Sequence, residues 1–440
     1  MVKEGHPKGL YLLFGIEMWE RFSFYGMRVL LMLYMLKALE FSTEKAGSVY
    51  GLYTGLVYLT PLIGGYIADR YWGQRKSILV GGILMMLGHF AMAVQSLAFF
   101  YSALALLILG NGFFKPNISI LVGGLYEKND SRRDAAFTIF YMGINLGAFF
   151  SPLVCSTLGE KYGWHYGFAA AGVGMGAGLV SYLWGQKKYL GDLGLAPVAK
   201  NQGAIGNVAL TGAEKKQIAV IFILAFFTIF FWGCFEQAGS SLTLFADSQT
   251  NRTIFGYEFP AGWYQSLNPL FIFVLAPFFS SFWIKLSQRD REPSSPMKFV
   301  WGLALLAAGF VLMAAAAKAY MTSGPVAAWW LFGVYFLHTL GELCLSPVGL
   351  SVVTKLSPAR FASLLMGTWF LSSFVANLAG GIFAGQYDTM APDNFFGILA
   401  ITAGVAAVAL LALVPLLKRW MSGQEAAEQV AHMKSEPKLT

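Results

Sequence analysis

Twelve apolar stretches follow one another along the 440-residue chain, separated by short polar segments. An α-helix needs about 20 mostly apolar residues to cross the hydrocarbon core of a bilayer, and each stretch is at least that long. The pattern therefore predicts an all-α membrane protein with twelve transmembrane helices. Their expected ranges are 10–36, 47–68, 78–99, 101–125, 135–158, 166–186, 217–246, 263–286, 299–320, 326–354, 361–386 and 394–417.

The longest polar gap, residues 187–216, separates two groups of six stretches. It is rich in glycine and lysine, a composition typical of a connector without long helices. We therefore expect an N-terminal six-helix bundle over 1–186, a cytoplasmic linker over 187–216 and a C-terminal six-helix bundle over 217–421. The polar residues 422–440 are expected to form a cytoplasmic tail that frays.

Composition agrees with a membrane protein. Charged residues make up 12% of the chain, compared with about 25% in soluble domains, and the mean hydropathy is +0.57. The three cysteines, Cys155, Cys234 and Cys344, have no metal-binding or redox spacing and are interpreted as packing residues. No nucleophile with a matching base is found either, so we expect no metal, no cofactor and no enzyme.

Lysine and arginine are distributed unevenly between the two sides of the predicted bundle. We number the loops between the twelve predicted helices from 1 to 11 along the chain. The two termini and the even-numbered loops together hold 23 of these residues, and the odd-numbered loops hold 5. Because cytoplasmic loops carry the excess of positive charge, both termini are expected in the cytoplasm, in a cell membrane that is most simply a bacterial inner membrane. The net charge of +8 suits contact with anionic lipid and makes nucleic acid an unexpected partner.

Ionisable side chains interrupt several of the apolar stretches. Burying an unpaired charge in a membrane costs several kcal/mol, so such residues must face one another, a ligand or a water-filled path. Three cations and four carboxylates leave one carboxylate without a fixed partner, which suits a site that takes up one proton. The seven residues are Glu17, Glu20, Arg21, Arg28, Lys115, Glu236 and Glu342.

Five polar residues share one side of the first predicted helix. At 100° per residue, Glu17, Arg21, Tyr25 and Arg28 fall within an arc of about 80°, with Glu20 about 60° to one side. Such a stripe cannot face lipid. It is therefore expected to line the interface between the two bundles, near the membrane midplane.

Other predicted helices repeat polar residues at a spacing of four, so polar faces from both bundles are expected to meet at one cavity. Arg28 and Lys115 make one wall of this cavity positive. Glu236 and Glu342 make the other wall negative. A zwitterion fits between them, with its carboxylate on the two cations and its ammonium on Glu342. The repeats are Asn111 and Lys115, Tyr141 and Asn145, Trp232 and Glu236, and His338, Glu342 and Ser346.

Amide and aromatic side chains are expected to contact the rest of such a ligand. Asn145 and Asn268 can bond a peptide amide in either direction. Broad aromatic surfaces would tolerate many ligand side chains. The candidates for these pockets are Tyr25, Tyr58, Tyr141, Trp232, Trp369 and Phe370.

Short motifs carry a resemblance to known transporters. Residues 64–76, GGYIADRYWGQRK, resemble the G-x-x-x-D-R-x-G-R-K element of the major facilitator superfamily. EMWERFSFYG at 17–26, FFKPNIS at 113–119 and FYMGINLG at 140–147 resemble the proton-dependent oligopeptide transporter family, with its E-x-x-E-R and F-Y-x-x-I-N-x-G motifs. The resemblance extends to WGCFEQ at 232–237, to Asn268-Pro269 and to GELCLSP at 341–347. Many bacterial members carry two additional helices between the halves, and none is visible in this sequence.

This resemblance implies a proton-coupled symporter of the major facilitator fold that imports di- and tripeptides by alternating access. It implies that Arg28 and Lys115 hold the peptide carboxylate and that Glu342 holds the amino terminus. It also implies an ion pair between Arg28 and Glu236 that opens when Glu236 takes up a proton. One chain suffices for two rocking bundles, so a monomer is expected.

Proton coupling is assigned to Glu236, assisted by Glu17 and Glu20, which are expected to pair with Arg21 and Lys115. Gating is assigned to Asp69, Arg70 and Arg75, with Asp69 expected to cap a helix or to pair with Arg70, Arg75 or Arg132. The predicted substrate-binding residues are Tyr25, Arg28, Tyr58, Lys115, Tyr141, Asn145, Trp232, Asn268, Glu342, Ser346 and Trp369.

Other interpretations stay open. A proton-coupled carrier of nitrate or another small anion would use the same cations but has no use for Glu342. A multidrug exporter of the same superfamily is disfavoured by the intact E-x-x-E-R motif and Lys115. Glu17, Glu20 and Arg21 can also be read as a static ion-pair cluster that holds the first bundle together, and His338 as an ordinary interior histidine.

Overall fold

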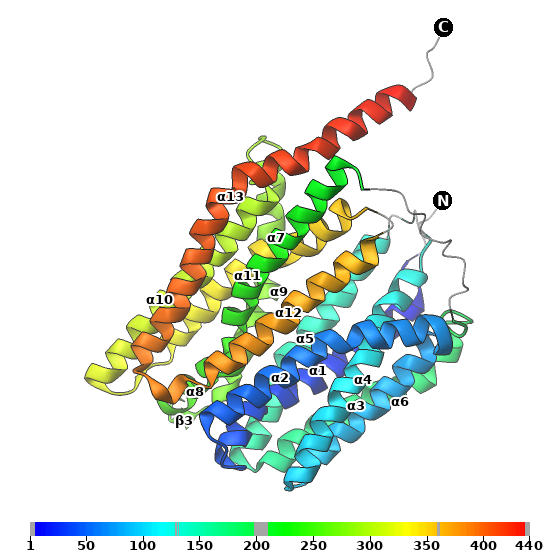
Figure 1. The fold of residues 1–440 in the computed structure, drawn as a ribbon. Coiled ribbons are helices and arrows are strands. Elements are labelled where there is room, and N and C mark those ends of the chain that lie inside the picture. The colour runs from blue at the N-terminus through cyan, green and yellow to red at the C-terminus, as the bar shows by residue number, and fades with distance from the viewer. Residues whose placement is uncertain (1–4, 128–129, 131, 198–209, 359–360, 436–440) are drawn as a thin grey trace.

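A computed structural model describes residues 5–127, 130, 132–197, 210–358 and 361–435, with side chains for all of these except 350, 362–363 and 422–435. Twelve helices of 19 residues or more are found in this part of the chain, as the hydrophobic pattern predicts. Ten of them are long and apolar enough to cross a membrane. The other two, α1 and α3, carry charged residues that lower their hydropathy but lie among the ten (Figure 1).

The first six helices form one bundle in which α1 packs on α5 and α6, and α4 packs on α2 and α3. Short loops join them. A π-helical turn, Ala68–Trp72, extends α2 as far as Gly73, whose φ of 74° ends the helix. The bounds are α1 Lys8–Lys37, α2 Thr43–Ile67, α3 Gln74–Met92, α4 Leu97–Gly124, α5 Arg133–Lys161 and α6 Trp164–Tyr189.

In its described residues, the second bundle contains six long helices and one short one. Its α10 packs on α11 and α13, and α7 packs on α12 and α13. The bounds are α7 Gly212–Phe235, α8 Ser241–Ser248, α9 Leu267–Ser287, α10 Ser295–Ser323, α11 Trp329–Leu356, α12 Ala362–Ala384 and α13 Pro392–Ser435. Short strands and 3₁₀ turns join some of these helices: β1 Thr250–Asn251, β2 Thr253–Ile254, β3 Tyr257–Glu258, β4 Val326–Ala327, and the turns Glu236–Gly239, Ala261–Ser266 and Tyr387–Thr389.

Three predicted boundaries are wrong. The expected helix 217–246 breaks after Phe235, where Gln237 donates to the carbonyl of Gly380 and accepts from the hydroxyl of Ser241, so that side-chain bonds replace the helical ladder. The expected helix 78–99 ends at Met92, and the apolar residues from Leu97 onward begin α4. The tail expected to fray from residue 423 continues α13 as far as Ser435.

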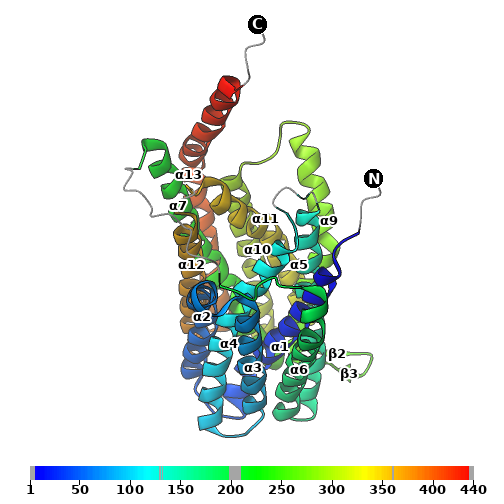
Figure 2. The ribbon, with the colours of Figure 1, turned by 90° about the vertical axis from the view of Figure 1, so that its right-hand side faces the viewer.

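Helix α6 ends and α7 begins at the same end of the molecule as the start of α1 and the end of α13 (Figures 1 and 2). We call this end the terminal face. Between α6 and α7, residues 190–197 and 210–211 contain no helix, and the rest of the expected linker lies outside the described residues.

The two bundles touch closely where α2 meets α12. A Cβ added to Gly51 would lie 2.9 Å from the Cα of Gly381, and one added to Gly47 would lie 2.5 Å from the carbonyl oxygen of Gly381. Only glycine permits so close an approach of two backbones. This contact lies near the start of α2 and the end of α12, which is the end of the molecule opposite the terminal face.

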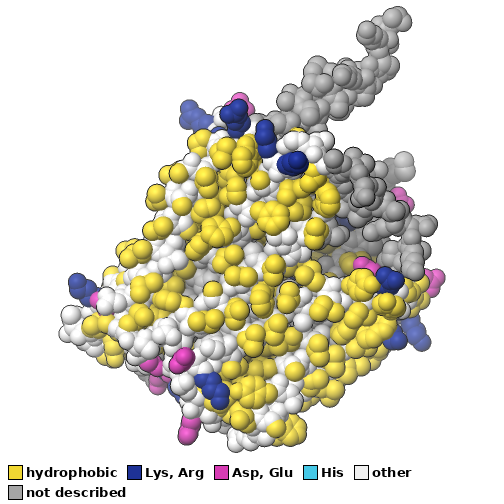
Figure 3. Space-filling model, viewed as in Figure 1, with side chains coloured by type: hydrophobic (Ala, Val, Ile, Leu, Met, Phe, Trp, Pro, Cys, Tyr) yellow, Lys and Arg dark blue, Asp and Glu magenta, His cyan; other side chains and the backbone are white. Residues whose placement is uncertain are grey.

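Hydrophobic side chains cover the flank of the molecule that Figure 3 shows, while the visible Lys, Arg, Asp and Glu side chains gather toward its two ends. This distribution matches an apolar band between two aqueous faces. The chain is a multi-pass membrane protein.

Candidate binding cavity

A cavity of about 410 Å³ lies between the two bundles. Helices α1, α2, α4 and α5 contribute one wall, and α7, α9, α11 and α12 contribute the other. Every residue predicted to bind substrate lines this cavity, as do Glu236 and Phe370. The predicted residues are Tyr25, Arg28, Tyr58, Lys115, Tyr141, Asn145, Trp232, Asn268, Glu342, Ser346 and Trp369.

An ion pair joins the two walls. Arg28 Nη1 of the first half lies 2.8 Å from Glu236 Oε2 of the second half, and both side chains are about nine-tenths buried. The guanidinium carbon of Arg28 also lies 5.1 Å from the centre of the Tyr25 ring. The expected pairing of Arg28 with Glu236 is therefore present in this arrangement.

The second cation of the first wall is unpaired. The Lys115 ammonium lies 4.9 Å from the centre of the Tyr58 ring, and no carboxylate of the described residues lies within 4.0 Å of it. The expected ion pair between Lys115 and Glu17 or Glu20 is wrong for this arrangement, in which both carboxylates pair with Arg21 instead. Lys115 thus presents a free positive charge to the cavity.

Glu17, Glu20 and Arg21 form a buried cluster within α1 that does not line the cavity. Arg21 binds Glu20 through two nitrogens, one of them at 2.7 Å from Glu20 Oε1, and its Nε lies 3.3 Å from Glu17 Oε1. The second oxygen of Glu17 is buried and has no hydrogen-bond partner among the described residues. The expected pairing with Arg21 is confirmed.

On the opposite wall, Glu342 is oriented by an amide. Asn268 Nδ2 donates to Glu342 Oε2 at 2.7 Å and lies 3.1 Å from the hydroxyl of Thr339. The amino group of Asn268 is therefore occupied, and its carbonyl oxygen is the group left for a ligand. Asn145 likewise donates to the carbonyl of Tyr141 at 3.0 Å, which leaves its own carbonyl oxygen for the cavity.

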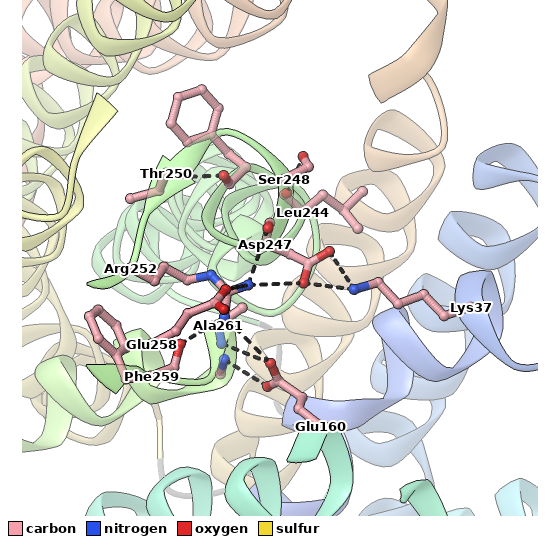
Figure 4. Close-up of polar contacts among 12 residues, drawn as sticks. Lys37, Glu160, Leu244, Asp247, Ser248, Thr250, Arg252, Glu258, Phe259 and Ala261 are labelled. Atoms are coloured by element: carbon pink, nitrogen blue, oxygen red, sulfur yellow. Dashed lines mark hydrogen bonds and ion pairs between the residues drawn. The ribbon is translucent and has the colours of Figure 1, made fainter. Parts of the chain in front are cut away.

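A network of charged side chains joins the halves at the end opposite the terminal face (Figure 4). Lys37 lies 2.6 Å from Asp247, and Arg252 lies 3.6 Å from Asp247 and 3.1 Å from Glu258. Glu160 accepts hydrogen bonds from the backbone N–H groups of Ala261 and Gly262 at 2.8 and 3.1 Å. We call Lys37, Glu160, Asp247, Arg252 and Glu258 the latch.

All hydrogen bonds and ion pairs given above between the halves lie at the level of Arg28 or farther from the terminal face. These contacts close the cavity on the latch side.

The loop motif between α2 and α3 does not make the expected arginine pairs. Asp69 accepts a hydrogen bond from the side chain of Gln74 at 2.9 Å and forms no ion pair with any residue that the structure describes. Arg70 turns toward Tyr66, whose hydroxyl lies 3.0 Å from its Nη1. Arg75 is buried and binds the side chain of Gln186 and the carbonyl of Gly191 at 2.6 Å. Arg75 therefore ties α3 to the end of α6 and the start of the linker.

Comparison with known proteins identifies the family. The sequence profile of the POT family matches residues 75–192 and 198–398. The chain is 38% identical to an uncharacterized transporter, YclF, of Bacillus subtilis (95% of this chain, 96% of the relative) and 36% identical to the peptide transporter YePEPT of Yersinia enterocolitica (96% and 97%). A crystal structure of a variant of peptide transporter POT in complex with alafosfalin matches with a TM-score of 0.87 and 36% identity, over 96% of this chain and 97% of that one.

The chain belongs to the POT family. This confirms the family that the motifs predict, and with it the major facilitator fold of two six-helix bundles.

This POT transporter has cavity residues that the sequence analysis missed. Ser373 and Asn377 of α12 line the cavity one and two turns after Trp369, so extending the spacing of four from Trp369 would have found them. Tyr335 and Gln265 line it as well; they bond the carbonyl of Ala238 at 3.3 Å and the hydroxyl of Thr243 at 3.0 Å. Gln265 lies on a 3₁₀ turn, where no helical spacing applies.

His338 lines the transporter's cavity but behaves as a packing residue. Its ring centre lies 4.6 Å from that of Phe310, and a Cβ added to Gly309 would lie 2.5 Å from His338 Nε2. Nε2 is directed at α10 and has no hydrogen-bond partner among the described residues. The geometry favours the interior-histidine interpretation.

Proposed function

We propose that this POT transporter is a proton-coupled symporter that imports di- and tripeptides by alternating access. Its relatives include proteins named peptide transporter and di-/tripeptide transporter, each covered over nearly its whole length. The observation that carries the proposal is the pair of oppositely charged walls of the cavity.

The substrate carboxylate binds Arg28 and Lys115, and the substrate ammonium binds Glu342. Lys115 supports this assignment because it has no carboxylate partner among the described residues, and burial without a counter-ion is costly. Asn268 holds Glu342 in place. The carbonyl oxygens of Asn145 and Asn268 accept the peptide N–H, and the aromatic residues of the cavity contact the side chains.

Proton coupling is assigned to Glu236, with Glu17, Glu20 and Arg21 assisting. Protonation of Glu236 removes the charge that holds Arg28, which frees Arg28 for the substrate and weakens the contact between the halves. At a membrane potential of 100 mV each inward proton supplies about 2.3 kcal/mol, which corresponds to roughly 50-fold accumulation of a neutral zwitterion.

The orientation of the protein in the membrane is assigned from the charge asymmetry of the loops. Both termini face the cytoplasm of a bacterial inner membrane, so the arrangement described above is inward-facing, and a monomer performs the cycle. Asp69, Arg70 and Arg75 act at the gate on the terminal face. Among these, Arg75 holds the linker, while Asp69 and Arg70 are exposed and available to the second half.

A carrier of nitrate or another small anion is the second candidate, and a multidrug exporter is the third. Glu342 and its amide partner Asn268 disfavour the anion carrier, because a carboxylate opposite the binding cations repels an anion. The exporter would require antiport. Arg28 and Lys115 disfavour it, because two cations in the cavity repel a lipophilic cation.

Uptake of a labelled dipeptide into proteoliposomes, with and without an imposed proton gradient, tests the proposal. We expect accumulation only with the gradient and competition by dialanine. Competition by nitrate or by a lipophilic cation, without competition by dialanine, would replace the peptide assignment with the second or third candidate.

A further inference from the structure

A second cavity, of about 790 Å³, lies on the flank of the molecule near the latch. Phe149 and Leu153 of α5 form its wall in the first half. Leu270 of α9 and Phe332 of α11 face them from the second half. We call this cavity the lateral groove. It is separate from the binding cavity, with which it shares no lining residue.

The helical walls of the lateral groove belong to segments that are long and apolar enough to span a bilayer. Most of the residues that line it are apolar or aromatic. Such a surface on a membrane-spanning bundle suits contact with acyl chains.

A hairpin formed by β2 and β3 covers one end of the lateral groove and projects sideways from the bundle (Figure 2). Its tip, Phe255-Gly256, has φ angles of 51° and 80°, the left-handed pair of a tight hairpin turn in which Asn or Asp usually precedes Gly. Phenylalanine is strained there, and its ring is fully exposed. An aromatic ring held away from the protein in this way suits the interface between membrane and water.

A cation lies at the same end of the groove. Lys161 Nζ is 4.7 Å from the ring centre of Tyr257, which lines the groove, and it donates to the backbone carbonyl of Glu258. No carboxylate of the described residues lies within 4.0 Å of this ammonium. The nearby carboxylates of Glu160 and Glu258 are directed at Arg252. Lys161 is thus free to attract a negative group.

We propose that the lateral groove binds a glycerophospholipid of the surrounding bilayer, with an acyl chain between the halves and its phosphate at Lys161. An apolar groove that ends at an unpaired cation matches the two ends of such a lipid. Since the walls come from both halves, the groove exists only while the latch side is closed. The bound lipid therefore stabilises the arrangement in which the latch is formed.

Trp329 provides the test, because it lines the lateral groove and is 60% exposed. Purified transporter in detergent is titrated with brominated phosphatidylglycerol, whose acyl bromines quench tryptophan on contact. The contribution of Trp329 is the difference between the wild type and Trp329→Phe. Trp184, near the end of α6 and 71% exposed, serves as the control through Trp184→Phe.

We expect quenching of Trp329 to saturate near one lipid per chain, while quenching of Trp184 rises in proportion to the lipid content of the micelle. Lys161→Gln should raise the half-saturating concentration of phosphatidylglycerol about fivefold and leave that of brominated diacylglycerol, which lacks phosphate, unchanged.

Either of two results would overturn the proposal. One is non-saturating quenching of Trp329 that parallels Trp184, including the case in which light scattering shows a second copy covering the groove. The other is a half-saturating concentration that Lys161→Gln does not change. Because binding is measured without transport, failure here leaves the peptide proposal intact, and failure of peptide uptake leaves the lipid result intact.

Discussion

Two buried ion-pair sites on α1 differ in the origin of their partners. Arg21 is held by Glu17 and Glu20 of its own helix, whereas Arg28, about two turns further along, is held by Glu236 of the other half. A movement of one half relative to the other leaves the first site intact and stretches the second. Of these two sites, only the second changes its ion-pair distance when the halves move apart.

Because both sites are buried, removing one partner of either ion pair destabilises the protein. The loss is expected to be greater at the first site, around Arg21, than at the second site, around Arg28. The side chains of Arg21 and Glu20 are at most 3% exposed, while those of Arg28 and Glu236 are about 10% exposed and line a cavity. An orphaned carboxylate at the second site is reached by water or a proton. The residues of the first site do not line the cavity.

The largest expected effect is therefore on stability, at the first site. Arg21→Met leaves two buried carboxylates without a counter-ion and should destabilise the transporter by about 3–5 kcal/mol, measured by thermal or denaturant unfolding in detergent. The matched Arg28→Met variant should lose only about 1–3 kcal/mol. Equal losses would contradict the distinction between the two sites.

Glu236→Gln should abolish the proton-driven accumulation of dipeptide, roughly 50-fold at 100 mV, because the ion pair to Arg28 no longer responds to a proton. Counterflow of labelled against unlabelled dipeptide should persist, since that exchange needs no net proton movement. Full accumulation by this variant would remove Glu236 from the coupling role.

The double variant Glu20→Gln with Arg21→Gln tests whether the first site takes part in proton coupling. It removes one charge of each sign from that site, and accumulation of dipeptide is measured as for Glu236→Gln. If it still accumulates dipeptide, Glu20 and Arg21 are purely structural.

Glu342→Gln should weaken dipeptide binding about tenfold, since a charge-assisted hydrogen bond contributes about 1.5 kcal/mol or more. Affinity for an N-acetylated dipeptide, which has no ammonium, should change by less than about twofold. Competition against a labelled dipeptide measures both. A similar loss for the two ligands would indicate that Glu342 only shapes the cavity through Asn268.

Asp247→Asn in the latch should have a smaller effect, because Lys37 is half exposed and such pairs contribute at most about 1 kcal/mol. We expect the population with the latch side closed to fall by up to about fivefold, less at high salt. Spin labels at the exposed positions Tyr162 and Met321, one in each half, report the distance distribution. An unchanged distribution would leave Arg28 and Glu236 as the principal electrostatic closure.

The smallest effect is expected at an ion pair outside the membrane. Hydrogen bonds from Arg132 lower the pKa of Asp130 to about 2. Because the pKa is depressed in the folded state, this pair contributes above the ordinary Asp pKa and is lost only as the pH falls toward 2. Asp130→Asn should therefore leave the pH profile of uptake above pH 4 unchanged, whereas Glu236→Gln flattens it.

The sequence predicted the twelve helices and the cavity because both depend on periodicity within one helix. Polar residues spaced by four, such as Tyr141 and Asn145, must share a face whatever their neighbours are, and a polar face in a membrane protein must turn inward. The same rule found Lys115, Tyr141, Asn145, Trp232, Glu342 and Ser346, but it wrongly placed Asn111, which does not line the cavity.

Features that depend on competition between partners were not predictable in this way. The sequence offered Glu17 and Glu20 two cations, and only the folded geometry decides that Arg21 binds both and leaves Lys115 free. Asp69 had three candidate arginines but binds Gln74, because Arg75 is engaged by Gln186 and the linker. The break after Phe235 depends likewise on Gln237 reaching α12.

The meeting of α2 and α12 through glycines bears on how fast the transporter can turn over. Where Gly47 and Gly51 touch Gly381, backbone rests directly on backbone, so parting the two helices there wets hardly any hydrocarbon. If leucine side chains filled this contact, each opening would cost about 25 cal/mol of free energy for every Å² of apolar surface exposed to water. A methyl group added at Gly51 would separate α2 from α12 and hold the latch side of the molecule partly open.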